Sequence, residues 1–374
     1  MARISKINSE HVDYVVEIAI MTGKNAPVNT LEKWNVGGTD LGFPVYDDKR
    51  KTMYYYFGDT FSTTNQIGGD WRSQTVGIAK NLDLSKGVLF DTFICDENGH
   101  AKEIIPSQKK TNEDEIEVTR IVTGGIVIQG VHYIYFMSIY KWRGGLPWLV
   151  GYNGVAKSTD GQNYKVLNNV FFTADSIANT MAQIGVSFDE AKKRLCPNMA
   201  QVFPYYQEKD DYVYIFGIPG GRKGSMKVAR YKKENIEDMN KYEYYVGGEF
   251  KAGFEALQEF SAAEDNFIAG PDIGEFSISY NKYLKKYVMT YLWSPLHPRI
   301  SNGIFMRLSD DLMHWSEHEG ILPFNFYYKT YAPLTHDLLE TKDGKIKYMI
   351  VSQWISPRED DYGYNPKVMA IHFK

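Results

Sequence analysis

Two aspartates, Asp40 and Asp59, lie at the outer ends of two apolar runs that a charged turn joins, in the stretch GGTDLGFPVYDDKRKTMYYYFGDTF. If residues 47–52 connect a β-hairpin whose centre lies between Lys49 and Arg50, the strand pairing runs outward until Asp40 faces Asp59. Directly opposed residues on antiparallel strands have Cβ atoms about 4.5–5.5 Å apart. Two carboxylates held that close titrate as a coupled pair with one pKa raised, so an acid can lie beside a base at neutral pH.

This prediction depends on the strand register. A β-bulge or a slip of one residue would turn the two side chains to different faces of the sheet. An aspartate in a Gly-Asp or Thr-Asp context also commonly caps a turn by accepting hydrogen bonds from backbone N–H groups. The catalytic and the turn-capping interpretations therefore both stay open for Asp40 and Asp59.

Short apolar and aromatic runs bounded by turn residues recur along the chain and predict buried strands. The runs cover residues 52–61, 131–140, 211–219, 285–293 and 345–354, and each is followed, after a loop, by a related run at 76–81, 153–158, 226–231, 303–308 and 367–372. Self-similarity at a period of roughly 65 to 75 residues, with three or four strands in each repeat, is typical of a propeller.

We therefore predict an all-β fold, a five-bladed β-propeller, with an irregular β-sandwich as the alternative. The expected organisation is a single catalytic domain over residues 1–374, with blades near 30–95, 118–173, 196–250, 270–325 and 328–374.

The two ends of the chain indicate how the ring closes. The fifth repeat stops at its third strand, at Phe373, and residues 14–20 (YVVEIAI) form a strand outside the repeats. We expect this N-terminal strand to complete the last blade, so that no long sheet edge stays unpaired. Two loops predict helices: SFDEAKKRL, where Ser187 and Glu190 have the capping-box spacing, and the amphipathic FEALQEF at 254–260.

Composition excludes several classes of protein. With 374 residues, 43% hydrophobic and 24% charged, the chain can bury a large core. The net charge of −4 gives no basic footprint for nucleic acid.

The sequence has no apolar run long enough to span a membrane, and its start, MARISKINSE, lacks the apolar segment of a signal peptide, so we expect a soluble chain without a membrane partner. The native compartment stays open, because a secreted or periplasmic protein could have lost its leader. Cys95 and Cys196 are expected in the core, and a monomer is expected.

Three motifs resemble the endo-D-arabinanase family of glycoside hydrolases, long known only as an uncharacterised domain of bacteria and their phages: GGTDLGFPV, YYYFGDTF and GEFSISYNKYLKKYVMTYL (274–292). The resemblance covers most of the chain, from Gly37 to the last predicted blade. It implies a five-bladed propeller that cleaves internal linkages of arabinofuranose polymers such as mycobacterial arabinan. It also implies Asp40 and Asp59 as catalytic carboxylates and Glu275 as a third carboxylate of the site, whereas the exact substrate does not follow because loops between blades vary.

The residue types fit this chemistry independently. Hydrolysis of a glycosidic bond needs a protonated acid at the leaving oxygen and a carboxylate that acts as base or nucleophile. We favour Asp40 as base or nucleophile and Asp59 as acid, because burial of the apolar run before Asp59 would raise its pKa. Whether the reaction retains or inverts the anomeric centre stays open.

Aromatic loop residues can stack on the apolar faces of sugars, and polar loop residues can bind their hydroxyl groups. Each of these residues could equally serve packing. The candidate substrate-binding residues are Trp71, Trp142, Trp148, Asn198, Arg222, Trp293, His297, Gln353 and Trp354.

Two other motifs are better explained as turns and loops. HWSEH (314–318) matches a zinc-protease motif, but that chemistry requires the motif to lie on a helix. Here Ser309 to Asp311 follow directly after a predicted strand, which indicates a turn. STDGQNY (158–164) occupies the equivalent place in the second repeat. GGRKGS (220–225) lacks the spacing of a phosphate loop. We therefore predict no metal ligands and no cofactor, and leave open a divalent cation in the central channel. A non-catalytic glycan-binding propeller is the alternative function, and a polysaccharide or oligosaccharide is the expected partner of either.

Overall fold

The computed structural model describes residues 3–64, 69–109, 116–142, 148–173, 177–295, 302–327, 329–355 and 363–374. These residues form an all-β protein with few short helices, as predicted. The chain divides into two compact units, which are described separately. Unit 1 comprises Met1–Ile104 and Gly274–Lys374, and unit 2 comprises Ile105–Ile273.

Unit 1 contains three groups of antiparallel strands. The first sheet has the order β1-β2-β22-β21-β20, the second the order β3-β4-β5-β6, and the third group consists of β16 to β19. The strands are β1 (Ile4–Ser5), β2 (Val12–Ile20), β3 (Leu41–Asp47), β4 (Thr52–Phe57), β5 (Val76–Ala79), β6 (Thr92–Phe93), β16 (Ala269–Asn281), β17 (Lys286–Trp293), β18 (Gly303–Ser309), β19 (Glu319–Pro323), β20 (Thr330–Leu334), β21 (Ile346–Gln353) and β22 (Lys367–Phe373). One short helix, α1 (Thr30–Trp34), precedes β3 in the described part of the unit.

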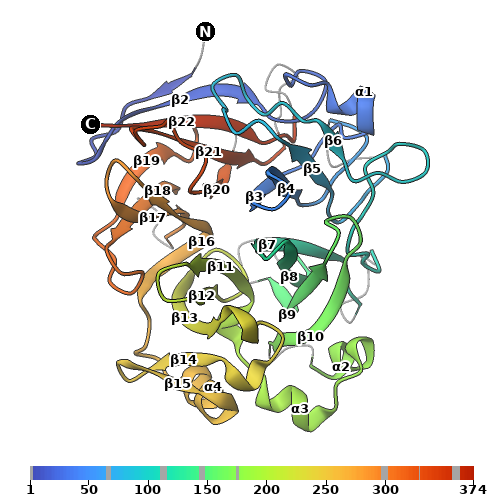
Figure 1. The fold of residues 1–374 in the computed structure, drawn as a ribbon, viewed down its shortest axis with the longest axis vertical. Helices are drawn as coiled ribbons and strands as arrows, with labels where there is room; N and C mark the ends of the chain where they lie inside the picture. Colours follow the sequence, from blue (N-terminus) through green and yellow to red (C-terminus); the bar gives the residue numbers. More distant parts are fainter. Residues whose placement is uncertain are drawn as a thin grey trace. The chain divides into compact units, whose positions relative to one another are not determined.

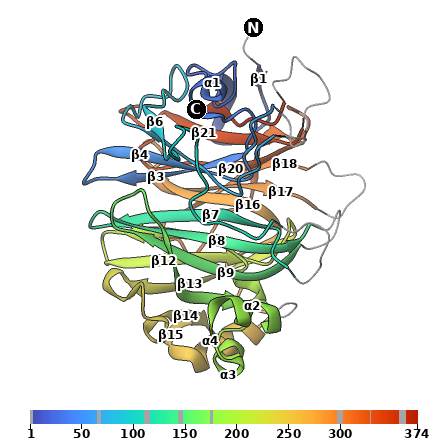
Figure 2. The same ribbon diagram turned by 90° about the vertical axis from the view of Figure 1, so that its right-hand side faces the viewer.

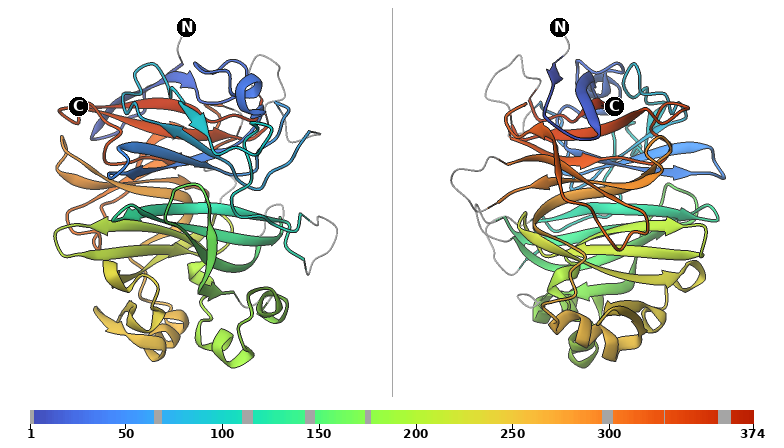
Figure 3. Two further views of the ribbon diagram at one scale, coloured as in Figure 1. Left: turned by 45° about the vertical axis from the view of Figure 1, so that its right-hand side comes forward. Right: turned by 90° about the vertical axis from the view of Figure 1, so that its left-hand side faces the viewer.

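Unit 2 contains one sheet of order β10-β9-β8-β7 and a second that begins β11-β12-β13, with β14 pairing to β13 and β15 to β14. The strands are β7 (Thr119–Ile128), β8 (Val131–Lys141), β9 (Leu149–Ser158), β10 (Lys165–Phe172), β11 (Gln201–Gln207), β12 (Tyr212–Ile218), β13 (Gly224–Lys232), β14 (Glu243–Val246) and β15 (Glu249–Ala252). Three helices, α2 (Ile177–Ile184), α3 (Phe188–Lys193) and α4 (Gly253–Ala262), lie together near β14 and β15 (Figure 3).

The number of blades stays a prediction. Strand β16 pairs with β13 through Ala269 and Ile273, and its later residues belong to the strand group that continues with β17. A single path of hydrogen-bonded strands therefore runs from β11 to β19, so the sheets do not separate cleanly into five blades.

Three of the local predictions are confirmed. Strand β2 pairs with β22 along the register from Val12↔Phe373 to Ile20↔Lys367, as expected for residues 14–20 (Figure 1). Helix α3 begins after Ser187, whose hydroxyl accepts a hydrogen bond from the backbone N–H of Glu190. Helix α4 contains the amphipathic segment predicted at 254–260.

The hairpin of β3 and β4 takes its register from its turn. All six residues of β4 are buried, so alternation of polar and apolar residues does not fix the pairing. Instead, Asp47 Oδ1 accepts hydrogen bonds from the backbone N–H groups of Lys49 and Arg50, both at 3.0 Å. Asp47 then pairs with Thr52, as the sequence predicts.

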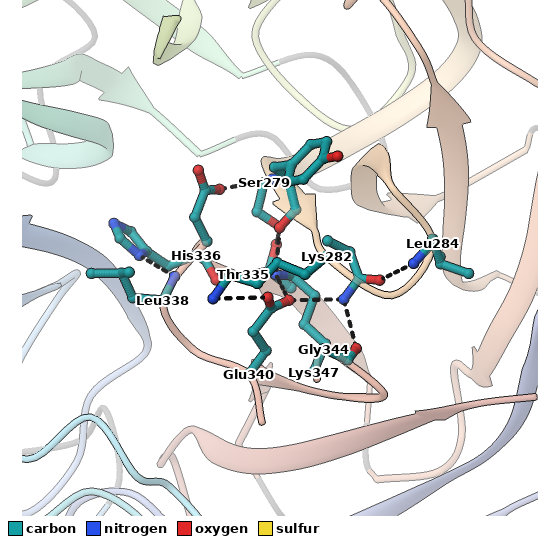
Figure 4. Close-up of polar contacts among 12 residues, drawn as sticks. Ser279, Lys282, Leu284, Thr335, His336, Leu338, Glu340, Gly344 and Lys347 are labelled. Carbon is teal, nitrogen blue, oxygen red and sulfur yellow. Dashed lines mark hydrogen bonds and ion pairs between the residues drawn. The ribbon is translucent and has the colours of Figure 1, made fainter. Parts of the chain in front are cut away.

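A polar seam joins the third strand group of unit 1 to the sheet of β20 and β21 (Figure 4). Ser277 Oγ accepts a hydrogen bond from the Thr335 N–H at 2.8 Å, and Ser279 Oγ and Thr335 Oγ1 are 2.9 Å apart. Deeper in the seam, Lys347 Nζ lies 3.3 Å from Glu340 Oε2, and both side chains are at most 1% exposed. The seam fixes β16 and β20 side by side, and both strands carry residues discussed below.

Lowering the pH from 7 to 4 is expected to destabilise the wild-type protein more than a His336→Gln variant. His336 Nδ1 accepts a hydrogen bond from the Leu338 N–H at 3.1 Å, which requires a neutral ring, and burial lowers the pKa of His336 to about 4. The unfolded chain has an ordinary histidine pKa of about 6.5, so between these values it binds a proton that the folded state does not. The free energy of unfolding should therefore fall by about 1–3 kcal/mol more in the wild type. Urea unfolding at pH 7, 6, 5 and 4 measures the difference, and equal pH dependence would contradict it.

Candidate active site

A β-bulge at the start of β3 changes the predicted position of Asp40. Leu41 pairs with Phe57, but Phe43 pairs with Tyr56, so the register shifts by one residue between them. Leu41 and Gly42 adopt positive φ angles of 60° and 96°, which is typical of a bulged strand. Asp40 therefore lies opposite Gly58, whose N–H donates to the Asp40 carbonyl oxygen at 3.1 Å. The prediction that Asp40 directly faces Asp59 is wrong by one residue.

Three buried threonines hold the strand ends that carry the aspartates. Thr39, next to Asp40, has its Oγ1 2.9 Å from Thr60 Oγ1, and Thr60 follows Asp59. Thr60 Oγ1 is also 3.0 Å from Thr75 Oγ1. These hydroxyl contacts fix both backbone segments where β3 and β4 diverge from regular pairing.

The carboxylate of Asp40 is half-buried and accepts a strong hydrogen bond from β20. The Tyr331 hydroxyl donates to Asp40 Oδ2 at 2.5 Å, a length typical of a bond to a charged oxygen. Gly58 makes room for this carboxylate, since a Cβ atom at that position would lie 2.3 Å from Asp40 Oδ1. Any larger residue at position 58 would displace the Asp40 side chain.

Asp59 is also half-buried and is held from the loop that follows β4. Trp71 Nε1 donates to Asp59 Oδ1 at 2.9 Å. The Trp71 ring stacks on Phe61, with ring centroids 6.4 Å apart and planes 11° from parallel. The sequence identified Trp71 as a residue of the site, and the structure places its indole N–H on one of the two predicted catalytic carboxylates.

Tyr364 is buried beside the backbone segment of Asp40, since the Thr39 N–H donates to its carbonyl oxygen at 2.6 Å. It is 1% exposed, and burial raises its pKa well above the usual value, with further increases from the charges of Asp40, Tyr331 and Asp59. The backbone segments that carry Asp40 and Asp59 are adjacent, because the Gly58 N–H donates to the Asp40 carbonyl oxygen and Thr39 contacts Thr60.

Two further predicted residues surround Tyr364. Trp354 is 39% exposed and contacts the Tyr364 ring edge to face, with centroids 6.1 Å apart. Gln353 is buried at the end of β21, and its side-chain Nε2 donates to the carbonyl oxygen of Gly363. Gln353 thus holds the segment before β22 that carries Tyr364, whereas Trp354 offers an open aromatic surface beside it.

The remaining predicted residues of unit 1 have different surroundings. Trp293 ends β17 and packs against Phe305 and His318, with ring centroids 4.8 and 4.7 Å away. Glu275 lies in β16 and is 8% exposed. His297 lies outside the described residues. The binding role of Trp293 stays a prediction, and its packing is accounted for by the strands β17 to β19.

In unit 2, three of the four predicted residues form a second aromatic group. Trp142 is 42% exposed and contacts Trp148 edge to face, with centroids 4.8 Å apart. The guanidinium carbon of Arg222 lies 5.4 Å from the centroid of the Trp148 ring. Asn198 lies in the short 3₁₀ helix Pro197–Met199 and is half-buried.

Both Asp-containing segments form turns, as predicted. Asp311 Oδ1 accepts from the N–H groups of Met313 and His314, and Asp160 Oδ1 does the same for Gln162 and Asn163. His314 is therefore held in a turn and not on a helix.

A group of side chains with metal-compatible spacing is formed by Glu10, His11 and Glu319. Both Glu319 oxygens are already engaged within the chain, because Oε2 accepts from Ser9 Oγ at 2.7 Å and Oε1 lies 2.6 Å from His11 Nδ1. This arrangement serves to fasten the N-terminal segment to β19.

Within the described ranges, none of the helices has the length and apolar character needed to cross a membrane.

Sequence reasoning missed Tyr331 and Tyr364. Both come from segments about three hundred residues away from Asp40 along the chain, and β20 reaches β3 through packing between neighbouring sheets (Figure 2). The available signal was weak: Tyr331 lies in β20 and Tyr364 three residues before β22, and the chain has 28 tyrosines.

The fold and the site together define an all-β protein with a pair of carboxylates at adjoining strand ends, surrounded by aromatic side chains. The chain belongs to the family described as Domain of unknown function (DUF4185), whose model matches residues 25–370.

Notoamide biosynthesis cluster protein J from Aspergillus sp. (strain MF297-2) is 33% identical over 153 residues, which is 37% of this chain and 40% of that protein. The matched segments of this chain's curated relatives cover about half or less of the length of those relatives. Among solved structures, a protein from Bacteroides ovatus ATCC 8483 with a hydrolase designation aligns over 99% of this chain and 93% of its own, with a TM-score of 0.59 and 11% identity. An arabinanase from Bacillus subtilis aligns over 89% of this chain and 96% of its own, with a TM-score of 0.45 and 10% identity.

Proposed function

We propose that this chain is a glycoside hydrolase that cleaves internal linkages of an arabinofuranose polymer of the D-arabinan type. The observation that carries the proposal is the acid pair: Asp40 and Asp59 are both half-buried, on backbone segments that the Gly58 N–H and the Thr39–Thr60 contact hold side by side. Two adjacent carboxylates supply the acid and the base or nucleophile that glycoside hydrolysis requires. The chemistry needs no metal or cofactor, and the proposal includes none.

The surroundings of the pair suit a sugar. Trp354 is exposed beside Tyr364, and Trp71 is half-buried beside Asp59, so aromatic surface flanks the carboxylates. Such rings can stack on the apolar faces of sugar residues. Within unit 2, considered by itself, Trp142 and Trp148 form a second aromatic surface of the same kind.

Glu275 is proposed as the third carboxylate. Ser277 and Ser279 of β16 bond to Pro333 and Thr335 of the segment from β20. Glu275 precedes Ser277 by two residues and so shares its face of the strand, which supports a position on the side of β16 that meets this segment, where Tyr331 binds Asp40. We also propose that the three strand groups of unit 1 and the two sheets of unit 2 are the blades of a five-bladed propeller.

Purified protein should release reducing ends from D-arabinan and produce oligosaccharides of intermediate length early in the reaction. Cleavage within the polymer gives such products, whereas attack from the chain end gives monosaccharides or disaccharides. L-arabinan, xylan and fructan serve as comparison substrates in the same reducing-end assay. Binding of D-arabinan without any cleavage would favour a non-catalytic glycan-binding propeller instead.

A further inference from the structure

We propose that a groove in unit 1 binds a sugar chain that carries carboxylate groups, at a site separate from the acid pair. The groove has a volume of about 740 Å³ and is lined by Thr341, Lys342, Asp343, Lys345, Ile346 and His372. Sites for small ligands typically enclose about 300–1,000 Å³, so the groove can hold one or a few sugar residues. The proposal concerns binding alone and does not rest on the proposed hydrolysis.

The groove lies at the opposite end of β21 from the tyrosine that binds Asp40. Tyr331, whose hydroxyl donates to Asp40, pairs with Ser352 near the last residue of β21. The groove residues Ile346 and His372 pair with each other at the first residue of β21. Since a strand rises about 3.4 Å per residue, the two ends are about 20 Å apart. The groove is therefore a second site.

The rim of the groove carries net positive charge. Lys342 and Lys345 are exposed, and neither forms an ion pair within the residues that the structure describes. The acidic side chain of the groove, Asp343, is engaged in its own turn, because its Oδ1 accepts from the Thr341 hydroxyl at 2.7 Å and from the Lys345 N–H at 3.1 Å. In a chain whose net charge is −4, this rim is a local attraction for anions.

His372 supplies a ring surface and a hydrogen-bonding group. Its ring stacks on Tyr14, with centroids 4.1 Å apart and planes 17° from parallel, and this contact fixes the orientation of the imidazole. In the part of the chain that the structure describes, neither ring nitrogen of His372 is hydrogen-bonded to another residue. Burial lowers the pKa of His372, so near pH 7 the neutral ring offers one donor and one acceptor to a sugar.

Two packed turns make the rim rigid and add an aromatic ring. Gly344 lies against the turn after β16, since a Cβ atom there would be 2.7 Å from the Tyr283 backbone nitrogen, and Asn281 Nδ2 donates to the Gly344 carbonyl at 2.8 Å (Figure 4). Tyr283 is 41% exposed, and its hydroxyl donates to the Lys374 carbonyl at 2.6 Å. Lys345 Nζ lies 5.6 Å from the centroid of the Tyr283 ring, so charge and aromatic surface adjoin.

A sugar chain with a carboxylate on each residue fits this arrangement. The rings of His372 and Tyr283 suit the apolar faces of sugars. The two lysines flank a turn, so their charges are spread along the rim and match a chain with repeated single charges. A phosphate group is typically held by an arginine fork or a nest of backbone N–H groups, and no arginine is among the lining residues.

The test is isothermal titration calorimetry with a tetrasaccharide of galacturonic acid, and with the neutral tetrasaccharide of galactose for comparison. Wild-type protein should bind the acidic tetrasaccharide at least about tenfold more tightly, and the difference should shrink at high salt. Lys342→Gln combined with Lys345→Gln should weaken this binding about tenfold, because both charges are lost. His372→Phe keeps a ring to stack on Tyr14 but has no ring nitrogen, so it should weaken binding about fivefold.

Lys24→Gln combined with Lys33→Gln is the matched control. It removes the same charge from exposed side chains beyond the far end of β2 from His372, so the affinity should stay within about twofold of wild type. Unchanged affinity in the Lys342 and Lys345 double variant, equal weakening in the control, or tighter binding of inorganic phosphate than of the acidic tetrasaccharide would each overturn the site. If His372→Phe does not fold, as urea unfolding would reveal, the exposed lysines decide the question.

Discussion

Replacing Asp40 or Asp59 by asparagine is expected to lower kcat on D-arabinan by about 10²–10⁴-fold, the contribution typical of a positioned acid or base. Asparagine has nearly the same shape but neither takes up nor releases a proton in this pH range. The hydrogen bonds from Tyr331 and Trp71 can be accepted by the amide oxygen, so both variants should keep the wild-type fold. The measurement is the initial rate of reducing-end release at saturating polymer, with urea unfolding as the check of folding.

The two variants should differ on an activated aryl arabinofuranoside, whose leaving group needs no proton. Asp59→Asn should recover most of its activity on this substrate, because the missing acid is no longer required, whereas Asp40→Asn should stay inactive. Asp48→Asn is the matched control, since Asp48 is exposed in the turn of the same hairpin, at the other end of β3 and β4. Near wild-type activity in either Asp40→Asn or Asp59→Asn would show that the acid pair is not catalytic.

The hairpin shows how far the sequence predicts the fold. Asp47 and the charged residues after it specify the turn, and the turn correctly sets the pairing of residues 43–47 with 52–56. The bulge at Leu41 and Gly42 could not be predicted, because nothing in the sequence indicates that a leucine will adopt a φ angle of 60°. The predicted pairing partner of Asp40 is therefore wrong by one residue, at the point where the chain leaves regular strand pairing.

The tyrosines show why the full site could not be predicted. Local sequence patterns predict which strand a residue belongs to. They do not predict the packing of β20 against β3, because that packing depends on side-chain contacts between sheets. Tyr331 and the buried Tyr291 both lie in apolar runs, and only the structure shows that Tyr331 reaches a carboxylate while the Tyr291 hydroxyl lies 3.2 Å from His318 Nδ1. The same limit applies to tryptophans: Trp71 binds Asp59, whereas Trp293 packs within its own strand group.

Replacing Lys347 by methionine is expected to lower the free energy of unfolding by about 3–5 kcal/mol. Lys347 is fully buried, and its ammonium group donates to the carbonyl oxygens of Tyr280 and His336 at 3.1 and 3.2 Å as well as pairing with Glu340 (Figure 4). Methionine fills a similar volume, so little of the effect comes from a cavity. The loss arises because two carbonyl groups lose their donor and Glu340 loses its buried cation, keeping only the Asn281 amide and the exposed Lys282 ammonium. Urea unfolding at pH 7, followed by tryptophan fluorescence, measures the change.

Lys342→Met provides the matched control, because Lys342 is exposed in the loop that leads into β21 and its replacement should change stability by less than about 0.5 kcal/mol. In a second variant, Lys347→Met combined with Glu340→Gln should recover part of the loss, since the buried carboxylate charge that has lost its buried cation is removed. Folded Lys347→Met should keep its kcat at low temperature, because the seam supports β16 and β20 without contacting Asp40 directly. Asp40→Asn should behave in the opposite way, with unchanged unfolding and lost turnover. Equal stability of Lys347→Met and wild type would mean that the seam does not hold the two strand groups together.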